Sequence, residues 1–307
     1  MRIVNIQVSG QRRLGFLDGN DVVDALAAGG NADLFGSTTA LIAAGEAGKS
    51  AAAALIASGK GRSPVASAKL LAPMLPSTIL CSGSNYRDHN KEKANTEISG
   101  KEPEFFIKTS DCVVGPGDTI VLDEALTKKL DGETELAVVI GKPGRHIPAD
   151  KGLEHVWGYT IINDVTARDR QVRMRDGFTW YELGRGKAFD SSAPMGPCIV
   201  TTDEIPDPQV LRVRTRVNGE PRQDGNTSEM IWSVAQLVHF FSVNFTLRPG
   251  MMIITGTPAG TAWSTDKELG GKWQPTPGLV PAKGYLQRGD RFESEIDRIG
   301  VLANVVG

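Results

Sequence analysis

The segment Glu133-Thr134-Glu135-Leu136-Ala137-Val138-Val139-Ile140 places two acidic residues directly before a run of five apolar ones. Three residues of that run are β-branched, which favours a buried strand. Because side chains alternate along a strand, Glu133 and Glu135 are expected to project from the same face.

Two carboxylates at the entrance to a core repel each other, and burying either charge is costly unless a cation lies between them. Oxygen ligands grouped in this way suit a hard divalent ion such as Mg²⁺, Mn²⁺ or Ca²⁺. The alternative interpretation is a strand whose entrance faces water, so that Glu133 and Glu135 are simply solvated.

The overall composition is that of an ordinary soluble globular protein. The chain has 307 residues, of which 40% are hydrophobic and 23% charged, with a net charge of −2. A nucleic acid or an anionic membrane as partner would favour a basic patch, which this balance does not indicate. No apolar run approaches the roughly 20 residues that span a bilayer, and the N-terminus lacks the apolar core of a signal peptide. We therefore expect a cytoplasmic protein with neither nucleic acid nor membrane as partner.

The cysteines indicate neither a disulfide framework nor a zinc site. Cys81, Cys112 and Cys198 are odd in number, far apart and without CxxC spacing. This pattern fits a reducing compartment.

Residues 1–72 differ from the rest of the chain in their sequence pattern. Strand-like runs at Arg2 to Val8 and Leu14 to Leu17 precede Ala-rich segments at Thr38 to Ala47 and Lys49 to Ala57, which favour helix. Pro73 and Pro76 follow directly and mark the start of the next part of the chain. We predict a small α+β N-terminal domain over residues 1–72 and a larger domain over residues 73–307.

His89 and Glu92 are three residues apart in a polar helical turn, so they share one helical face. A carboxylate beside an imidazole fixes the tautomer and raises the basicity, as a general base requires. The alternative is a surface pair of little energetic consequence.

A third carboxylate, Asp164, ends the apolar run from Trp157 to Ile162. With Glu133 and Glu135 it makes a plausible oxygen-donor cage for a metal. Shortly afterwards, Arg168 and Gln171 share a helical face that suits an anionic ligand, or else they are ordinary solvated groups.

Two further elements are predicted near the C-terminus. Arg212 to Val217 and Glu220 to Gln223 flank an Asn218-Gly219 turn and form a β-hairpin. An amphipathic helix is predicted from Met230 to Phe241, capped by the segment 226–228.

Five short motifs follow one another in a specific order along the chain. They are Asn85-Tyr86-x-x-His89-x-x-Glu92, Glu133-x-Glu135-Leu136, Asp164-x-Thr166-Ala167-Arg168-Asp169, Gly186-Lys187-x-Phe189-Asp190 and Thr255-Gly256-Thr257-Pro258. In this order they resemble the fumarylacetoacetate hydrolase superfamily over about residues 79–260, and again at the turn 288–290.

The resemblance implies roles for specific residues. Mg²⁺ or Mn²⁺ is expected on Glu133, Glu135 and Asp164. The catalytic residues would be His89 and Glu92, on a loop that closes over the substrate, with Lys187. We assign substrate binding to Tyr86, Lys108, Arg168, Gln171 and Thr257. The fold implied is α+β and β-rich, with a mixed-sheet, roll- or barrel-like catalytic domain, and the usual assembly is a homodimer.

The expected activity is hydrolysis of a C–C bond in a 2,4-dioxo acid of the acylpyruvate type, giving pyruvate and a carboxylic acid. The same residues also suit an isomerase or decarboxylase acting on a 2-hydroxy-diene-dioate or an oxaloacetate-like substrate in aromatic catabolism. A non-catalytic ligand-binding relative is the third alternative. One departure from the family pattern is an insertion at about 262–286, rich in Gly, Pro and Trp, which we interpret as a lid or a dimer-contact arm.

Overall fold

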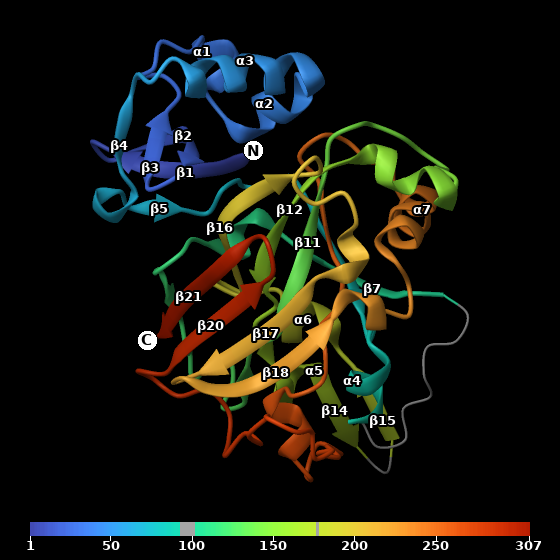
Figure 1. Cartoon of the computed structure of the whole chain (residues 1–307). Helices are drawn as coiled ribbons and strands as arrows, with labels where there is room; N and C mark the ends of the chain where they lie inside the picture. The colour runs from blue at the N-terminus through green and yellow to red at the C-terminus, as the bar shows by residue number, and fades with distance from the viewer. Residues whose placement is uncertain (93–101, 176–177) are drawn as a thin grey trace.

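The central strand of the protein is β11 (Thr134–Ile140), in which every residue is buried. The computed structural model describes residues 1–92, 102–175 and 178–307. Strand β11 pairs antiparallel with β12 (Val156–Asn163) on one side and with β19 (Met252–Ile254) on the other. The strand predicted from the apolar run is therefore confirmed, and it lies inside a sheet (Figure 1).

The main sheet has 12 strands in the order β4-β3-β2-β1-β16-β12-β11-β19-β6-β7, with β5 on β1 and β8 on β16. Its remaining strands are β1 (Arg2–Val8), β2 (Gln11–Asp18), β3 (Asp21–Asp24), β4 (Arg62–Pro64), β5 (Leu70–Leu71), β6 (Ile79–Gly83), β7 (Glu104–Lys108), β8 (Val113–Val114) and β16 (Ala193–Thr201).

The second sheet has five strands in the order β18-β17-β20-β21-β9. They are β9 (Thr119–Ile120), β17 (Arg212–Val217), β18 (Glu220–Asn226), β20 (Arg291–Ile296) and β21 (Gly300–Val306). The predicted hairpin is confirmed as β17 and β18. Two small ribbons complete the strands: β10 (Leu130–Asp131) with β13 (Thr166–Ala167), and β14 (Val172–Arg175) with β15 (Phe178–Tyr181).

The helices are short and surround the sheets. The α-helices are α1 (Ala32–Phe35), α2 (Thr38–Ala43), α3 (Gly45–Ala57), α4 (Arg87–Lys91), α5 (Arg168–Gln171), α6 (Leu183–Lys187) and α7 (Val234–Asn244). The 3₁₀ helices are η1 (Val65–Ser67), η2 (Ser110–Cys112), η3 (Ala149–His155), η4 (Pro208–Val210), η5 (Thr227–Glu229) and η6 (Ala262–Thr265). None of the helices in the described ranges is long and apolar enough to cross a membrane.

The predicted α+β, strand-rich class is confirmed. The sheets are open, and the described residues form no closed barrel. The predicted helix from Met230 was wrong at its start, because Asn226 caps η5 instead. Helix α7 begins at Val234, where Ser233 and Gln236 form a reciprocal capping box that satisfies the free N–H groups of the first turn.

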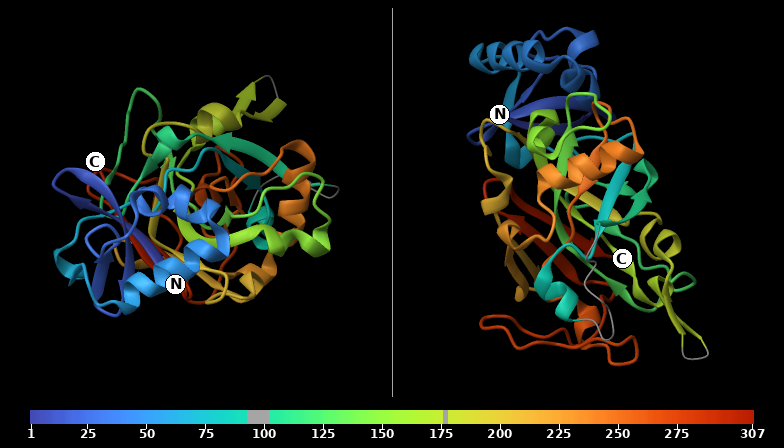
Figure 2. Two further views of the ribbon diagram at one scale, coloured as in Figure 1. Left: turned by 90° about the horizontal axis from the view of Figure 1, so that it is seen from above. Right: turned by 90° about the vertical axis from the view of Figure 1, so that its right-hand side faces the viewer.

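The N-terminal segment joins the main sheet through the pairing of β1 with β16. Its side chains Ile3 and Leu41 share a hydrophobic cluster with Ala137 of β11. Figures 1 and 2 place helices α1–α3 and the segment 262–286 at opposite ends of the molecule. A domain boundary at residue 72 stays a prediction.

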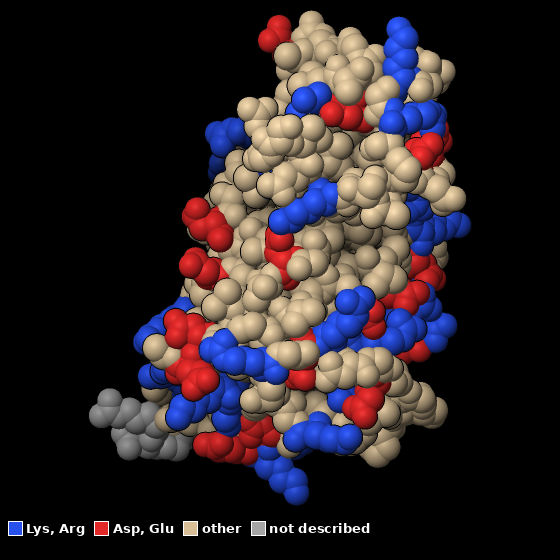
Figure 3. All heavy atoms as spheres, turned by 90° about the vertical axis from the view of Figure 1, so that its left-hand side faces the viewer, with Lys and Arg blue, Asp and Glu red and all other residues tan. Residues whose placement is uncertain are grey.

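Charged side chains of both signs are interspersed on the face shown in Figure 3. Interspersed charges create no large field of one sign over this face.

Candidate active site and metal centre

Three buried carboxylates converge where β11 and β12 pair. Glu133 directly precedes β11, Glu135 lies on it, and Asp164 directly follows β12. The register sets Thr134 opposite Asn163, and the N–H of Asp164 donates to the carbonyl of Glu133 at 2.8 Å. One oxygen from each of the three carboxylates lies within 4.8 Å of the others. The predicted grouping of acidic residues is therefore present, and it faces the interior rather than water.

Three buried cations surround this cluster. Lys187, at the end of α6, places Nζ 2.7 Å from Oε2 of Glu133 and 2.6 Å from Oδ2 of Asp164. Nζ of Lys108 lies 2.8 Å from Oδ1 of Asp164, and a terminal nitrogen of Arg168 lies 2.6 Å from Oε1 of Glu133. Buried carboxylates and cations thus interlock in one network.

The environment separates the pKa values of the two glutamates. Burial favours the protonated form of Glu133, but Lys187 and Arg168 outweigh it and hold the pKa of Glu133 well below its usual range. Burial, with Asp164 and Glu133 nearby, raises the pKa of Glu135 well above its usual range. Within the part of the chain that the structure describes, Glu135 has no ion pair, and its Oε2 accepts the N–H of Gly256 at 2.6 Å.

This charge pattern fits a divalent ion. When it is ionised, Glu135 carries a buried negative charge with which no cation among the described residues forms an ion pair, and an added cation would neutralise it. The donors are all carboxylate oxygens, which suit hard ions such as Mg²⁺ or Mn²⁺. Glu133, Glu135 and Asp164 are the residues that could hold such an ion.

The predicted His–Glu pair is also assembled and buried. His89 on α4 places Nδ1 3.0 Å from Oε2 of Glu92, and the other oxygen of Glu92 accepts the N–H of Gly260 at 2.8 Å. A carboxylate on Nδ1 favours the tautomer that carries its proton there and leaves Nε2 as the basic atom. The loop after β19 therefore anchors both Glu135, through Gly256, and Glu92, through Gly260.

A small cavity of about 40 Å³ lies over the carboxylate cluster. The residues predicted for the site that line it are His89, Glu133, Glu135, Asp164, Arg168, Gln171, Lys187 and Thr257. Tyr86, Lys108 and Glu92 are buried and are not among the residues that line this cavity. The ammonium of Lys108 is held by the carbonyls of Lys187, Val165 and Ser192 as well as by Asp164.

The side chains of Arg168, Gln171 and Thr257 are occupied by neighbours. Arg168 donates to Gln171 Oε1 at 2.9 Å in addition to its ion pairs. The hydroxyl of Thr257 donates to the carbonyl of Thr134 at 2.9 Å and accepts from Gln223 at 2.8 Å. The substrate-binding roles assigned to these residues stay predictions.

The sequence reasoning missed two residues that contact Arg168. Asp131 pairs with Nε of Arg168 at 2.8 Å. The ring of Trp263 lies over the guanidinium, 5.2 Å from ring centre to Cζ. Asp131 precedes Glu133 by two residues, so the same alternation argument could have found it. Trp263 lies at the start of the inserted segment, where η6 forms part of the cavity wall.

Comparison with known proteins agrees with this geometry. A family model described as "Fumarylacetoacetate (FAA) hydrolase C-terminal" matches residues 78–307. This chain therefore belongs to the fumarylacetoacetate hydrolase family.

Relatives within the family carry several activities in their names. Oxaloacetate tautomerase YisK from Bacillus subtilis is 43% identical over 241 residues, covering 78% of this chain and 73% of that protein. The mitochondrial oxaloacetate tautomerase FAHD2A from Homo sapiens is 39% identical over 269 residues, covering 87% and 79%. Among solved structures, maleylpyruvate hydrolase from Sphingobium sp. SYK-6 in complex with manganese(II) and pyruvate matches with a TM-score of 0.77 and 28% identity, covering 100% of this chain and 98% of that one.

Proposed function

We propose that this protein is a divalent-metal-dependent tautomerase that interconverts the keto and enol forms of a small 2-oxo dicarboxylic acid of the oxaloacetate class. The observation that carries the proposal is the position of His89, oriented by Glu92, on the same small cavity as the three carboxylates. The relatives named as oxaloacetate tautomerases support the same choice.

The metal centre would be formed by Glu133, Glu135 and Asp164. A bound Mg²⁺ or Mn²⁺ supplies Lewis-acid polarisation of the 2-oxo group and orients the acid.

The proton transfer is assigned to His89. Its Nε2 takes a proton from C3 of the keto acid and returns a proton to the 2-oxo oxygen, so that keto acid becomes enol without consuming water. The carboxylate of Glu92 stabilises the imidazolium that forms between the two transfers.

The ammonium of Lys187 stabilises the negative charge that develops on the substrate oxygen. Burial disfavours the charged lysine, but Asp164 and Glu133 outweigh it and raise the pKa of Lys187 above its usual value. Lys187 therefore stays protonated at neutral pH and can act as an electrostatic partner.

The second candidate is the C–C hydrolysis of a 2,4-dioxo acid that the sequence favoured. The His89–Glu92 pair, which could equally activate a water molecule, favours it. The structural match to a maleylpyruvate hydrolase supports it as well. Isomerase or decarboxylase action on a 2-hydroxy-diene-dioate uses the same groups.

An assay with two substrates separates the candidates. The protein is stripped with EDTA, reloaded with Mg²⁺ or Mn²⁺, and incubated with oxaloacetate and with acetylpyruvate. Keto–enol exchange is followed by ultraviolet absorbance, and pyruvate release is measured enzymatically. We expect exchange of oxaloacetate that EDTA abolishes and that His89→Ala lowers by about 10²–10⁴-fold. Pyruvate release from acetylpyruvate without oxaloacetate exchange would establish the hydrolase instead.

The homodimer, the cytoplasmic location and the 2-oxo acid substrate stay proposals from the family resemblance. Light scattering coupled to size-exclusion chromatography tests the first of these.

A further inference from the structure

Asp131, which ends β10, is a buried carboxylate with every oxygen partnered. Oδ1 accepts the backbone N–H of Gly132 at 2.9 Å and that of Ala262 at 3.1 Å. Oδ2 accepts the backbone N–H of Trp263 at 3.1 Å and Nε of Arg168 at 2.8 Å. These four donors use the acceptor positions that a carboxylate offers. Both oxygens of Asp131 are therefore occupied by hydrogen bonds within the protein, and Asp131 is not a fourth metal ligand.

Arg168 connects Asp131 to the metal centre. The side chain is fully buried, and its planar fork donates to Asp131 through Nε and to Glu133 through a terminal nitrogen at 2.6 Å. Gln171 holds the other terminal nitrogen, and Trp263 covers the face of the guanidinium. Because the fork is rigid, the position of Asp131 determines where the guanidinium meets Glu133.

The shared guanidinium also determines how much of the negative charge on Glu133 is neutralised. Arg168 divides its positive charge between Asp131 and Glu133. If Asp131 were neutral, Glu133 would be the sole anionic partner of the guanidinium and would offer less negative charge to an added cation.

We propose that Asp131 is a positioning residue of the metal centre, which acts through Arg168 to fix the orientation and charge of Glu133 and so strengthens divalent-ion binding. The inference rests on the metal centre of the proposed function. It assigns to Asp131 a role that is separate from catalysis, because the residue touches neither the cavity over the carboxylates nor the proton-transfer pair.

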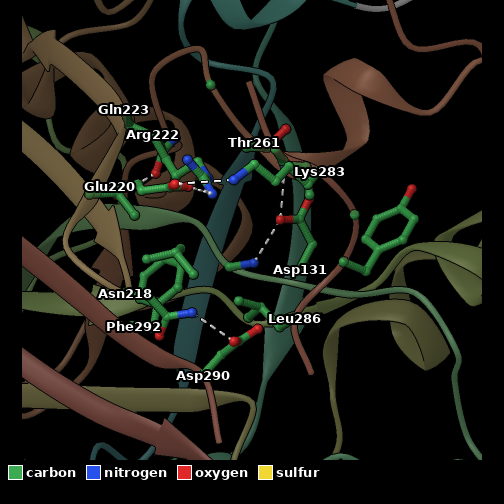
Figure 4. Close-up of a pocket in the computed structure, with 18 of the residues that line it drawn as sticks. Asp131, Asn218, Glu220, Arg222, Gln223, Thr261, Lys283, Leu286, Asp290 and Phe292 are labelled. Atoms are coloured by element: carbon green, nitrogen blue, oxygen red, sulfur yellow. Dashed lines mark hydrogen bonds and ion pairs between the residues drawn. The ribbon is translucent and has the colours of Figure 1, made fainter. Parts of the chain in front are cut away.

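The surroundings of Asp131 supply a matched control. Asp131 also borders a larger cavity of about 520 Å³ between the β17–β18 hairpin and the segment 282–287 (Figure 4). Asp290 lines the same cavity, and its two oxygens accept from Nδ2 of Asn218 and from the N–H of Gln287, each at 2.8 Å. Asp290 has no contact with Arg168, so Asp290→Asn removes an equal charge from this cavity without touching the proposed path.

The test measures Mn²⁺ binding to the full-length, metal-free protein by titration calorimetry. Asp131→Asn keeps the size of the side chain and removes its charge. We expect the dissociation constant for Mn²⁺ to rise by roughly 10–100-fold, as found for residues that orient metal ligands. Asp290→Asn should leave it within about twofold of wild type.

A second variant makes the path through Arg168 measurable. Arg168→Lys keeps the positive charge but lacks the fork that reaches both acids, so it should weaken Mn²⁺ binding to a similar degree. In the double variant the two effects should not add, because both remove the same connection. If Asp131→Asn fails to fold, an unchanged Mn²⁺ affinity in Arg168→Lys would still overturn the inference, because the path from Asp131 to Glu133 runs through this guanidinium.

The possible outcomes are distinct. A wild-type protein that binds no Mn²⁺ would overturn the proposed metal centre, and this inference with it. Wild-type binding with an unchanged dissociation constant in Asp131→Asn or Arg168→Lys would overturn this inference alone. A lowered unfolding temperature of the metal-free variant with unchanged Mn²⁺ affinity would also overturn it, because Asp131 would then be merely structural.

Discussion

The ammonium nitrogen of Lys187 lies 2.7 Å from Oε2 of Glu133, inside the carboxylate cluster of the site. The same nitrogen also reaches Asp164. In the metal-free protein, Lys187 thus supplies part of the positive charge that the carboxylates require. Removing either member takes away part of the compensation of the other, because Glu133 would retain Arg168 and Lys187 would retain Asp164 as buried partners.

Replacing Lys187 by Met should therefore destabilise the metal-free protein and increase its dependence on metal. Leaving Glu133 and Asp164 without this partner is expected to lower the free energy of unfolding by about 3–5 kcal/mol, the cost of breaking a buried ion pair. Added Mn²⁺ should then raise the unfolding temperature more in the variant than in wild type, as followed by circular dichroism.

Lys91→Met is the matched control, because Lys91 forms an exposed pair with Asp88. It should change the unfolding temperature little. Equal effects of the two substitutions would contradict the role given to Lys187.

Glu92→Gln should reduce turnover while leaving metal binding intact. The amide keeps an oxygen for the N–H of Gly260 but lacks the charge that stabilises the imidazolium of His89. We expect kcat to fall by about 10²–10⁴-fold, with the Mn²⁺ dissociation constant unchanged. Glu154→Gln, an exposed substitution on η3, serves as control. A parallel loss of Mn²⁺ affinity would mean that Glu92 belongs to the metal centre instead.

The sequence predicted the groups whose placement follows from local periodicity. Glu133 and Glu135 share a face because strands alternate, and His89 meets Glu92 because of helical spacing. Asp164 joins them through a property of the fold, namely the pairing of β11 with β12. The order of motifs along the chain, rather than any single motif, indicated that these segments meet.

The contacts that support those groups could not be predicted in the same way. Trp263 reaches Arg168 across 95 residues of sequence, and no local pattern encodes that approach. Gly256 and Gly260 act through backbone N–H groups, which side-chain patterns do not reveal. Such contacts depend on tertiary packing, so they become visible only in the structure.

Gly260→Ala should damage both stability and activity. Gly260 has φ +111°, and an added Cβ would lie 1.9 Å from the carbonyl oxygen of Arg222. The loop must shift, which costs at least about 1–3 kcal/mol and displaces the N–H that holds Glu92. Denaturant unfolding and kcat report the two effects. Gly284→Ala, where an added Cβ meets no atom within 4 Å, should be neutral in both measurements. A fully active and stable Gly260→Ala would show that this loop does not anchor the His89–Glu92 pair.

Metal affinity should rise with pH through the titration of Glu135. Burial, Asp164 and Glu133 raise the pKa of Glu135 in the folded, metal-free protein above its ordinary value of about 4.5. A divalent ion binds the deprotonated form, so binding must release a proton and weaken as the pH falls through the raised pKa.

The stability of the metal-free protein should change in the opposite sense. A folded-state pKa above the unfolded value contributes stability that is fully present below about pH 4.5 and is lost as the pH rises through the folded pKa. Calorimetry with Mn²⁺ and urea unfolding, each repeated between about pH 5 and pH 8, measure the two trends. Glu135→Gln should remove the part of the pH dependence of the free energy of unfolding that comes from Glu135. It should also abolish most Mn²⁺ binding. An affinity that stays constant over this range would mean that Glu135 is already ionised throughout, and that the cations around Glu133 and Asp164 neutralise it without a metal.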